Sequence, residues 1–392
     1  MLTQDQEALI AATAPVVAEH LNTITQRFYP LMFERYPSVK PLFNQVHQQN
    51  GAQPRALAGA VLAYVGIRQD PAKARQTLET VVNKHVSLGI EPYQYPIVGE
   101  CLMMAIGEVL GDAVTPEIAD AWSALYQELA DLLIDLEEKR YQEFEQREGG
   151  WRGTRRFHVA DSQQESAVIR SFILEPEDGG PVAEHAPGQY IGVKVTIDGE
   201  PVHRHYSLSA TPNGRAYRLS IKRESDGRVS RYFHDQLANG GVVELLPPAG
   251  EMTLVPGDAP LMLISGGVGQ TPLLPMAKQA LGQGRRVVYL HAAQTPEYWA
   301  FADELRALEK AYPEQFKLVT VFEQSAEGDH QGRINQALLA DYLPEGAHCY
   351  FVGPHGMMEV VEQSLKQLGV AESHRHYEHF GPAMPLNAVN AA

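Results

Sequence analysis

Hydrophobic residues in the first part of the chain recur with the period of a helix. Between Glu117 and Phe144 they follow one another at alternating spacings of four and three, which places them on one helical face. Thr115 and Pro116 stand just before this run and are typical of a helix start. Comparable patterns predict further helices over residues 5–34, 55–69, 73–88 and 94–110. We therefore predict an all-α domain over residues 1–145.

The middle of the chain has a different pattern, with short runs rich in β-branched and aromatic residues. Gly149 and Gly150 follow the charged end of the last predicted helix and mark a domain boundary. From Arg156 to about Leu254 the β-like runs are separated by Gly, Pro, Asp and Asn. This pattern predicts an antiparallel barrel or sandwich over residues 150–258.

From Ala259 onward, short and fully apolar runs alternate with helical stretches. The runs are LMLIS (261–265), RVVYLHAA (286–293), KLVTVF (317–322) and HCYFVG (348–353). Such runs are typical of strands that are buried on both faces of a parallel sheet, with helices as crossovers. We therefore predict an α/β domain with a parallel sheet over residues 259–392.

Charge and cysteine content narrow the class of protein. The chain has 32 Lys and Arg against 48 Asp and Glu, a formal net charge of −16, which disfavours nucleic acid or an anionic membrane as the main partner. Its two cysteines, Cys101 and Cys349, are far apart, which disfavours a disulfide scaffold and a cysteine-based zinc site. The N-terminal residues do not resemble a secretory signal, and no run approaches the ~18–20 apolar residues of a membrane span. We expect a cytoplasmic, monomeric, multi-domain protein with no nucleic-acid partner and no obligate membrane partner.

A glycine-rich loop follows the LMLIS run and precedes a helical stretch. In such a loop the backbone N–H groups can approach a phosphate at the positive end of the helix. Pro272 stands where the dinucleotide fingerprint would have a third glycine, and an ordinary tight turn is the alternative interpretation. The residues predicted to contact a nucleotide here are Gly267, Val268, Gly269, Gln270, Thr271 and Pro272.

Two neighbouring predicted strands carry side chains that suit a flavin nucleotide. Tyr190 opens one strand, and the run from Arg204 to Ser207 lies in the next, with Arg204 and Tyr206 on one face and the residues between and after them on the other. An aromatic ring can pack on the flavin, and Arg204 can neutralise a pyrophosphate. The alternative is a cross-strand Tyr–Arg pair on a solvated barrel face.

The motifs RHYS, GGVGQTP and YEHFGP occur in this order and resemble the ferredoxin–NADP reductase superfamily. With the helical domain ahead of them, essentially residues 1–385 resemble the bacterial flavohemoglobins, a family of nitric oxide dioxygenases. The resemblance implies a globin fold that binds haem b, then an antiparallel β-barrel that binds FAD, then an α/β domain that binds NAD(P)H. It implies the following flavin-site residues: Tyr190, Arg204, His205, Tyr206, Ser207, His379, Phe380, Gly381 and Pro382.

The same resemblance implies a haem site in the helical domain. His85 would be the iron ligand through one ring nitrogen, and Tyr95 and Glu137 would hydrogen-bond to the other nitrogen, giving the ring more imidazolate character. From the residues alone, a lone histidine on a helix is more often a surface or core residue. Tyr95 could equally be a core residue, and Glu137 could lie on a solvated helix face.

On the opposite side of the haem, the resemblance implies that Tyr29 donates its hydroxyl to bound O2 with support from Gln53, while Phe43 and Leu57 pack on the macrocycle. The alternative is that these are ordinary core residues. Lys84 and Glu378 match positions between haem and flavin, although both would also pass as surface charges.

Two residues depart from the pattern of the superfamily. Val352 and His379 stand where a cysteine is usual beside the nicotinamide, which implies less efficient hydride transfer. The absence of a Cys-x-x-Cys-His motif disfavours covalent haem attachment.

Taken together, the resemblance implies that NAD(P)H reduces FAD, that FAD reduces the haem iron, and that ferrous haem binds O2 and converts NO to nitrate. The expected small-molecule partners are thus O2, NO and NAD(P)H, and the sequence leaves NADH versus NADPH open. One alternative is an oxygen-binding or redox-sensing globin whose reductase resets the iron. A third interpretation, a flavin reductase that has lost haem, is disfavoured because five haem-site residues are retained.

Overall fold

The computed structural model describes residues 2–43, 52–237 and 239–380, and the side chains of 52–58 also lie outside the described part. The chain divides into two compact units, Met1–Phe144 and Glu145–Ala392, which we call the helical unit and the sheet unit. No helix in the described part is long and apolar enough to span a membrane. The predicted limits 1–145, 150–258 and 259–392 stay predictions.

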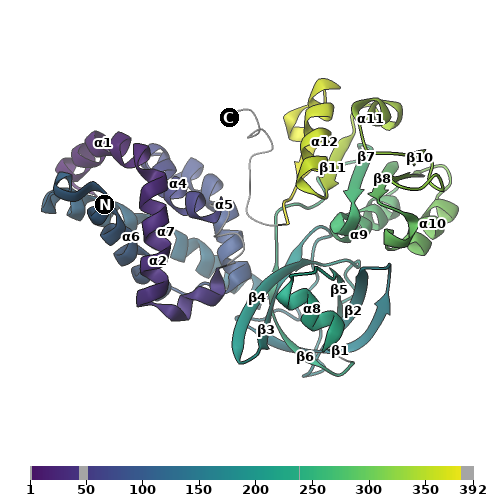
Figure 1. Cartoon of the computed structure of the whole chain (residues 1–392), viewed down its shortest axis with the longest axis horizontal. Helices are drawn as coiled ribbons and strands as arrows, with labels where there is room; N and C mark the ends of the chain where they lie inside the picture. Colours follow the sequence, from purple (N-terminus) through teal and green to yellow (C-terminus); the bar gives the residue numbers. More distant parts are fainter. Residues whose placement is uncertain (1, 44–51, 238, 381–392) are drawn as a thin grey trace. The chain divides into compact units, whose positions relative to one another are not determined.

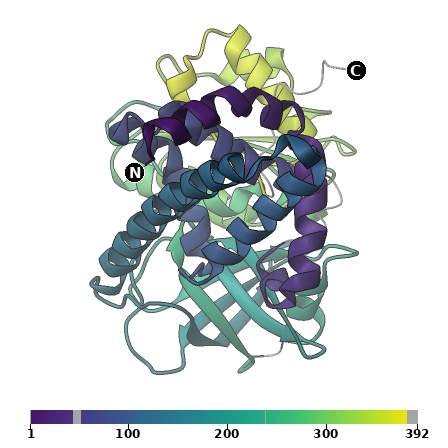
Figure 2. The same cartoon turned by 90° about the vertical axis from the view of Figure 1, so that its left-hand side faces the viewer.

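The helical unit consists of helices throughout its described residues (Figures 1 and 2). Figure 2 shows that these helices cross one another rather than lying in parallel. The elements are α1 (Gln4–Glu19), α2 (Leu21–Arg35), η1 (Pro37–Leu42), α4 (Ala52–Ile67), α5 (Pro71–Leu88), α6 (Gln94–Leu110), η2 (Gly111–Ala113) and α7 (Pro116–Glu145).

The segment 5–34 is helical as predicted, but it consists of two helices, α1 and α2, with a break that the sequence pattern did not indicate. His20, with φ −94° and ψ 7°, ends α1 and precedes α2. Both helices bury apolar residues in the same core, among them Val17 and Ile24, so the apolar spacing continues through the corner. The hydrophobic pattern therefore could not reveal the break.

In the first half of the sheet unit, six antiparallel strands form what we call the barrel lobe. They are β1 (Arg155–Gln164), β2 (Ile169–Pro176), β3 (Tyr190–Ile197), β4 (Glu200–Ser207), β5 (Tyr217–Lys222) and β6 (Val242–Ala249). Their order is β4-β3-β6-β1-β2-β5, and a bridge between Leu208 and Leu219 brings the two end strands together. A short helix that the sequence pattern did not predict, α8 (Arg228–Asp235), packs Phe233 on Phe172 with ring centroids 5.2 Å apart.

The second half of the sheet unit is the parallel lobe, whose six strands all pair in parallel. The strands are β7 (Leu261–Gly266), β8 (Val287–Ala293), β9 (Phe316–Phe322), β10 (His330–Gln331), β11 (His348–Val352) and β12 (Arg375–Tyr377). The helices are η3 (Gly267–Gly269), α9 (Gln270–Gly282), η4 (Pro296–Tyr298), α10 (Ala302–Ala311), α11 (Gln336–Tyr342), α12 (His355–Gln367) and η5 (Glu372–His374).

The strand order of the parallel lobe, β10-β9-β8-β7-β11-β12, places its candidate ligand site. The apolar residues of α9 and α10 cover one face, and those of α11 and α12 cover the other (Figure 1). The chain winds in one direction from β7 to β9 and then returns to the other side of β7 with β11. In open α/β sheets, ligands bind outside the carboxyl ends of the strands where the order reverses, which here means the ends of β7 and β11.

Candidate functional site

Three helices of the helical unit bring His85, Tyr95 and Glu137 together. The Tyr95 hydroxyl donates to Glu137 Oε1 at 2.5 Å, and His85 Nδ1 lies 2.7 Å from the same oxygen and 2.9 Å from Tyr95 Oη. Glu137 is only 3% exposed, so the alternative of a solvated helix face is wrong for this residue. We call these three residues the histidine triad.

The charges in the triad determine which atoms donate hydrogen bonds, which atom accepts them and which nitrogen can coordinate a metal. Burial and the negative charge of Glu137 raise the pKa of Tyr95, so the phenol stays protonated and donates a hydrogen bond to the carboxylate. His85 Nδ1 is then best occupied as a donor to Glu137, which leaves Nε2 as the ring atom that can coordinate a metal. A carboxylate on the far nitrogen raises the basicity of such a ligand.

Tyr126 supports the triad, although it was not among the residues predicted from the sequence. Its hydroxyl donates to the backbone carbonyl of Tyr95 at 2.8 Å, which fixes the start of α6 against α7. The close approach of the two helices depends on Gly99, since a Cβ there would lie 2.5 Å from the Tyr126 ring. A glycine inside a helical pattern, followed later by an inward tyrosine, was the signal in the sequence.

The other predicted haem residues lie on α2, after η1 and on α4. Tyr29 is 6% exposed, burial raises its pKa, and its ring contacts Phe43 with centroids 5.6 Å apart. Gln53 and Leu57 belong to α4, which packs against α2, but their side chains lie outside the described part.

A single histidine suits a haem better than a bare metal ion. Among the residues that the structure describes, no group of three or more His, Cys, Asp or Glu is arranged to hold a metal. A haem would need only one side-chain ligand from the protein, because the porphyrin itself supplies four nitrogens to the iron. The triad, with one free coordinating nitrogen and a buried carboxylate behind it, therefore fits a haem.

In the barrel lobe, β3 and β4 bring the predicted flavin residues together on two faces of one strand. Tyr190 lies opposite Ser207 in the ladder, and its ring contacts His205 with centroids 5.0 Å apart. Arg204 and Tyr206 are on the other face, where the Tyr206 ring lies 5.9 Å from that of Phe233 in α8. Because β4 ends the strand order, a ligand along this edge can contact side chains from both faces.

The turn before Tyr190 packs against the parallel lobe. Gly188 has φ +104°, and a Cβ there would lie 1.9 Å from the carbonyl oxygen of Met252 and 2.3 Å from the Met276 side chain of α9.

Burial lowers the pKa of the Arg204 guanidinium, which donates to the His203 carbonyl at 2.7 Å. A partly buried cation at this strand edge fits an anionic ligand such as a pyrophosphate.

The glycine-rich loop lies at the carboxyl end of β7, beside the end of β11. A Cβ at Gly269 would lie 2.0 Å from the carbonyl oxygen of Val352, so the two backbones touch. Gln270, Thr271 and Pro272 are buried, and the Thr271 hydroxyl donates to the Val268 carbonyl at 2.9 Å. The part of the loop that remains accessible is half-exposed Gly267 and Val268, which suits contact with a phosphate through the backbone.

The C-terminal residues follow β12 toward the start of α12. The His379 ring lies 5.7 Å from that of His355, nearly parallel, and Phe380 is 48% exposed. Gly381 and Pro382 lie outside the described residues. Exposed Lys84 and half-buried Glu378 belong to different units, so their position between haem and flavin stays a prediction.

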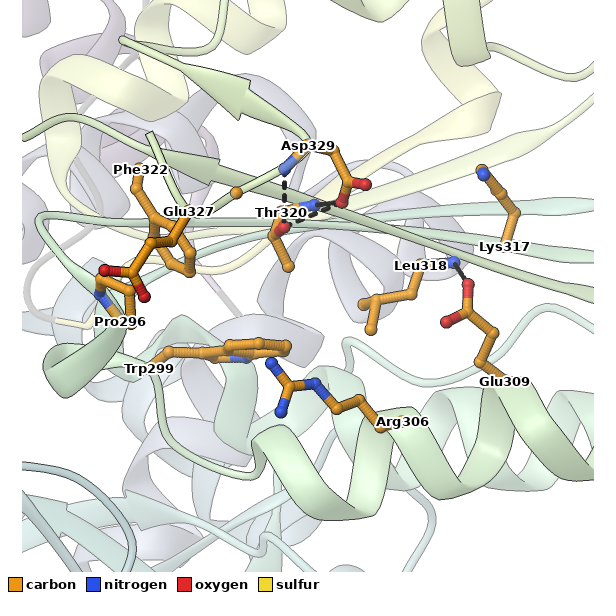
Figure 3. A pocket seen from close by; sticks show the side chains of 11 residues that line it. Pro296, Trp299, Arg306, Glu309, Lys317, Leu318, Thr320, Phe322, Glu327 and Asp329 are labelled. Carbon is orange, nitrogen blue, oxygen red and sulfur yellow. Dashed lines mark hydrogen bonds between the residues drawn. The ribbon is translucent and has the colours of Figure 1, made fainter. Parts of the chain in front are cut away.

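A cavity of about 320 Å³ in the parallel lobe was not predicted from the sequence (Figure 3). Its wall has the Arg306 guanidinium over the Trp299 ring, 5.0 Å from the centroid. On the outer edge of β9, the Glu309 carboxylate accepts a hydrogen bond from the backbone N–H of Leu318. The Asp329 carboxylate accepts one from the backbone N–H of Thr320. These acids protect a sheet edge, and no residue of the glycine-rich loop lines the cavity.

Each of the three parts of the chain matches the model of a known protein family. The globin family model matches residues 26–133, the oxidoreductase FAD-binding domain matches 156–254, and the oxidoreductase NAD-binding domain matches 263–363. The chain therefore contains a globin domain and the FAD- and NAD-binding domains of an oxidoreductase. The fold predicted from the sequence, an α-helical domain, an antiparallel barrel and a parallel α/β domain in this order, is confirmed.

Several relatives match over their whole length. The flavohemoproteins of Pseudomonas putida and Pseudomonas aeruginosa are each 47% identical, covering 98% and 99% of this chain and 100% of the relative. The flavohemoglobin of Malassezia yamatoensis, solved with bound FAD and heme, superposes with a TM-score of 0.85 at 30% identity and covers 97% of this chain and 100% of that one. The FAD/NAD-binding domain of nitric oxide dioxygenase from Vibrio cholerae gives a TM-score of 0.55 at 38% identity, covering 58% of this chain and 99% of that one. The chain belongs to the flavohemoprotein family.

Proposed function

We propose that this oxidoreductase is a nitric oxide dioxygenase, which uses NAD(P)H, O2 and NO and forms nitrate. The overall reaction balances as two NO, two O2 and one NAD(P)H giving two nitrate ions, NAD(P)+ and one proton. The observation that carries the proposal is the histidine triad, in which a buried carboxylate shares one oxygen between His85 Nδ1 and the Tyr95 hydroxyl. A monomeric state and a cytoplasmic location stay predictions.

Residues from all three domains would hold the cofactors. His85 Nε2 would ligate the haem, with Phe43 and Leu57 packed against it. Tyr190, Arg204, His205, Tyr206 and Ser207 would hold FAD together with the segment from His379 to Pro382. The loop from Gly267 to Pro272 would hold NAD(P)H through the backbone of its accessible residues, Gly267 and Val268, while its buried residues shape the loop. When bound, the haem supplies the iron at which O2 and NO react, and FAD accepts two electrons and releases them singly.

The side chains of the helical unit then have separate tasks. Glu137 accepts the hydrogen bond from His85 Nδ1–H and increases the electron donation of the ring, a property that favours O2 activation over simple O2 storage. Tyr95 holds the carboxylate in place through its own hydrogen bond. Tyr29, kept protonated because burial raises its pKa, would donate a hydrogen bond to the oxygen substrate, with Gln53 as its support.

The second candidate function is an oxygen-binding or redox-sensing globin whose reductase resets the iron. The same cofactors would serve both functions, so the two differ in turnover rather than in composition. Tight O2 binding with slow nitrate production favours the sensor.

The first experiment is the visible spectrum of the purified protein before and after NADH, under carbon monoxide and without oxygen. We expect a haem band with a flavin shoulder that shifts to the ferrous–CO form, followed in air by NO consumption with matching nitrate. His85→Ala should remove the haem signal and keep NADH-driven reduction of ferricyanide, whereas His20→Ala, at the corner of α1 and α2, should change neither. A haem that NADH cannot reduce, or NO consumption without nitrate, contradicts the proposal.

A further inference from the structure

Three charged residues join the barrel lobe to the parallel lobe of the sheet unit. Arg218 on β5 donates through Nη1 to Glu304 Oε1 of α10 at 2.6 Å, and Lys278 on α9 donates to Glu304 Oε2. The side chains of Arg218, Lys278 and Glu304 are 14%, 30% and 29% exposed. We call these three residues the interlobe cluster.

On its barrel side, Arg218 is held by further hydrogen bonds. Its Nη2 donates to the Ser209 carbonyl, and its Nε donates to the Ser209 hydroxyl at 3.2 Å. That hydroxyl lies 2.7 Å from the hydroxyl of Ser220, two residues along β5 from Arg218. The guanidinium is therefore a fixed part of the barrel wall, and its planar fork can serve two lobes at once.

On the parallel-lobe side, the guanidinium lies over the ring of Phe301, 5.0 Å from the centroid. Phe301 is 2% exposed and has φ +57°, a left-handed conformation that is uncommon for a bulky residue, and it stands directly before α10. Such conformations persist where the surrounding structure enforces them, and they often occur at functional positions. Here the unusual backbone presents an aromatic face to the arginine of the other lobe.

Glu304 stays an anion within this junction. Burial alone would raise its pKa, but the positive charges of Arg218 and Lys278, with their hydrogen bonds, hold the pKa below its usual value. Glu165, the residue after β1, interacts electrostatically with the three residues of the cluster, and burial raises its pKa. An ion pair with limited exposure and several hydrogen bonds restricts motion more than a surface pair does.

The cluster is connected to the glycine-rich loop in two ways. Lys278 belongs to α9, the helix that begins at this loop, and β5 itself contacts η3, the three-residue helix inside the loop. Nearby, the hairpin tip of β1 and β2 enters the parallel lobe, where Ala167 N–H donates to the Glu297 carbonyl at 2.8 Å. Loss of the cluster would leave the lobes attached by that tip and by packing, but free to change their angle.

We propose that Arg218 is a positioning residue for hydride transfer, which sets through Glu304 and Lys278 the placement of the glycine-rich loop relative to the flavin-binding edge of the barrel. The proposal rests on the reductase half of the proposed function. In that step the C4–H bond of the dihydronicotinamide breaks, and the hydride, with two electrons, forms a new N–H bond on the flavin as NAD(P)+ is released. Neither Arg218 nor Glu304 would touch the reacting atoms.

The size of the effect follows from the sensitivity of such transfers to distance. A displacement of about 1 Å between reacting groups can lower a rate by about 100-fold, even when the mutated residue is remote. A changed lobe angle alters the approach of nicotinamide to flavin, while the loop itself, and thus nucleotide binding, stays intact. We therefore expect kcat and the hydride-transfer rate to fall, with little change in KM.

The test uses the holoprotein with Arg218→Lys, Glu304→Gln and, as a matched control, Arg155→Lys. Arg155 has the same 14% exposure as Arg218, pairs with Asp178 and lies over the Trp151 ring, but all these partners are in the first part of the sheet unit. Flavin reduction by NADH is followed by stopped-flow absorbance without oxygen, alongside ferricyanide reduction. The kinetic isotope effect is measured with NADH deuterated at the transferred position.

We expect both cluster variants to reduce flavin about 10-fold more slowly, with a larger isotope effect, an unchanged FAD content and KM within about twofold. Arg155→Lys should retain the rate and the isotope effect. Unchanged hydride transfer in Glu304→Gln, or an equal loss in Arg155→Lys, would overturn the proposal. If Arg218→Lys fails to fold, Glu304→Gln and Lys278→Met decide, since each removes one charge and keeps the barrel residues.

This test separates the proposal from the proposed function. Flavin reduction and ferricyanide reduction need neither NO nor haem turnover. A protein that shows the Arg218 effect but makes no nitrate keeps the positioning role and loses the dioxygenase function. A protein that makes nitrate normally with every cluster variant, at unchanged hydride rates, keeps the function and loses the positioning role.

Discussion

The histidine triad is formed by side chains, whereas the glycine-rich loop is formed by backbone. The triad consists of side chains from three helices, up to 52 residues apart in sequence, joined by hydrogen bonds around one buried carboxylate oxygen. The loop consists of backbone at a strand end, where the absence of a Cβ at Gly269 lets two chain segments touch. The function of the triad depends on hydrogen bonds between specific polar atoms. The function of the loop depends on the close approach of two backbone segments, which a side chain at Gly269 would prevent.

This difference predicts opposite responses to mutation. Replacing one atom type by another of equal size should damage the triad, where each hydrogen bond has a defined donor and acceptor. Adding one methyl group should damage the loop, where the nearest atoms belong to backbone that cannot move independently. Four predictions test this comparison.

The largest effect is expected for Gly269→Ala. Its backbone, with φ −60° and ψ −8°, is allowed for alanine, so the damage would come from the 2.0 Å contact between the new Cβ and the Val352 oxygen. We expect kcat/KM for NADH with ferricyanide to fall about 100-fold, because the loop must move away from the end of β11. Gly282→Ala in α9, where nothing lies within 4 Å, is the control and should keep wild-type activity. Equal activity of both variants would refute the steric description of the loop.

Glu137→Gln should have the next largest effect, although it preserves the shape of the side chain. It replaces a carboxylate by an amide opposite His85 Nδ1, and loss of such a partner typically costs about 10–100-fold in activity or affinity. We expect slower NO-dependent nitrate formation and a lower iron–histidine stretching frequency in resonance Raman spectra, with unchanged ferricyanide reduction. Glu138→Gln changes the neighbouring residue, which bonds to Gln142, and should leave all three values unaltered. A Raman frequency that does not move in Glu137→Gln would remove the electronic role of the carboxylate.

The comparison also explains what could be predicted from the sequence. The glycine-rich loop is local, so the strand, glycines and helix start could be recognised from consecutive residues. The long strands of both lobes were recognised for the same reason. The short elements were not predicted, namely β10 with 2 residues, β12 with 3 and α8 with 8. A segment of so few residues is too short to reveal a hydrophobic period.

Contacts between side chains that are far apart in sequence could not be predicted from the sequence patterns. The triad came from the family resemblance and not from spacing, since Glu137 stands among other charges and its neighbours suggest a solvated face. Arg218 and Glu304 are 86 residues apart and carry no local sign that they meet. Only the packing of α6 on α7, and of β5 beside α10, brings such residues within hydrogen-bond distance.

Tyr29→Phe should have an intermediate effect. It removes one hydroxyl and keeps the ring contacts with Phe28 and Phe43, so folding should be little affected. Loss of a single hydrogen bond of about 1–1.5 kcal/mol corresponds to roughly a 10-fold rise in the KM for O2. Oxygen-dependence of NO consumption measures this value. An unchanged KM for O2 would place Tyr29 in the core without a role toward the substrate.

The smallest effect is expected for Thr271→Val, inside the loop itself. Thr271 is 2% exposed, and its hydroxyl donates to the Val268 carbonyl, so we assign it to folding of the loop rather than to phosphate contact. Valine has nearly the same shape, and loss of the hydrogen bond should lower the free energy of unfolding by about 1 kcal/mol. The affinity for NADH, measured by titration of the oxidised holoprotein, should then change by less than about twofold, since a phosphate bound by backbone N–H groups does not need this hydroxyl. A fall in affinity of about 10-fold with unchanged stability would mean that the loop binds through a side chain, and the contrast with the triad would fail at this residue.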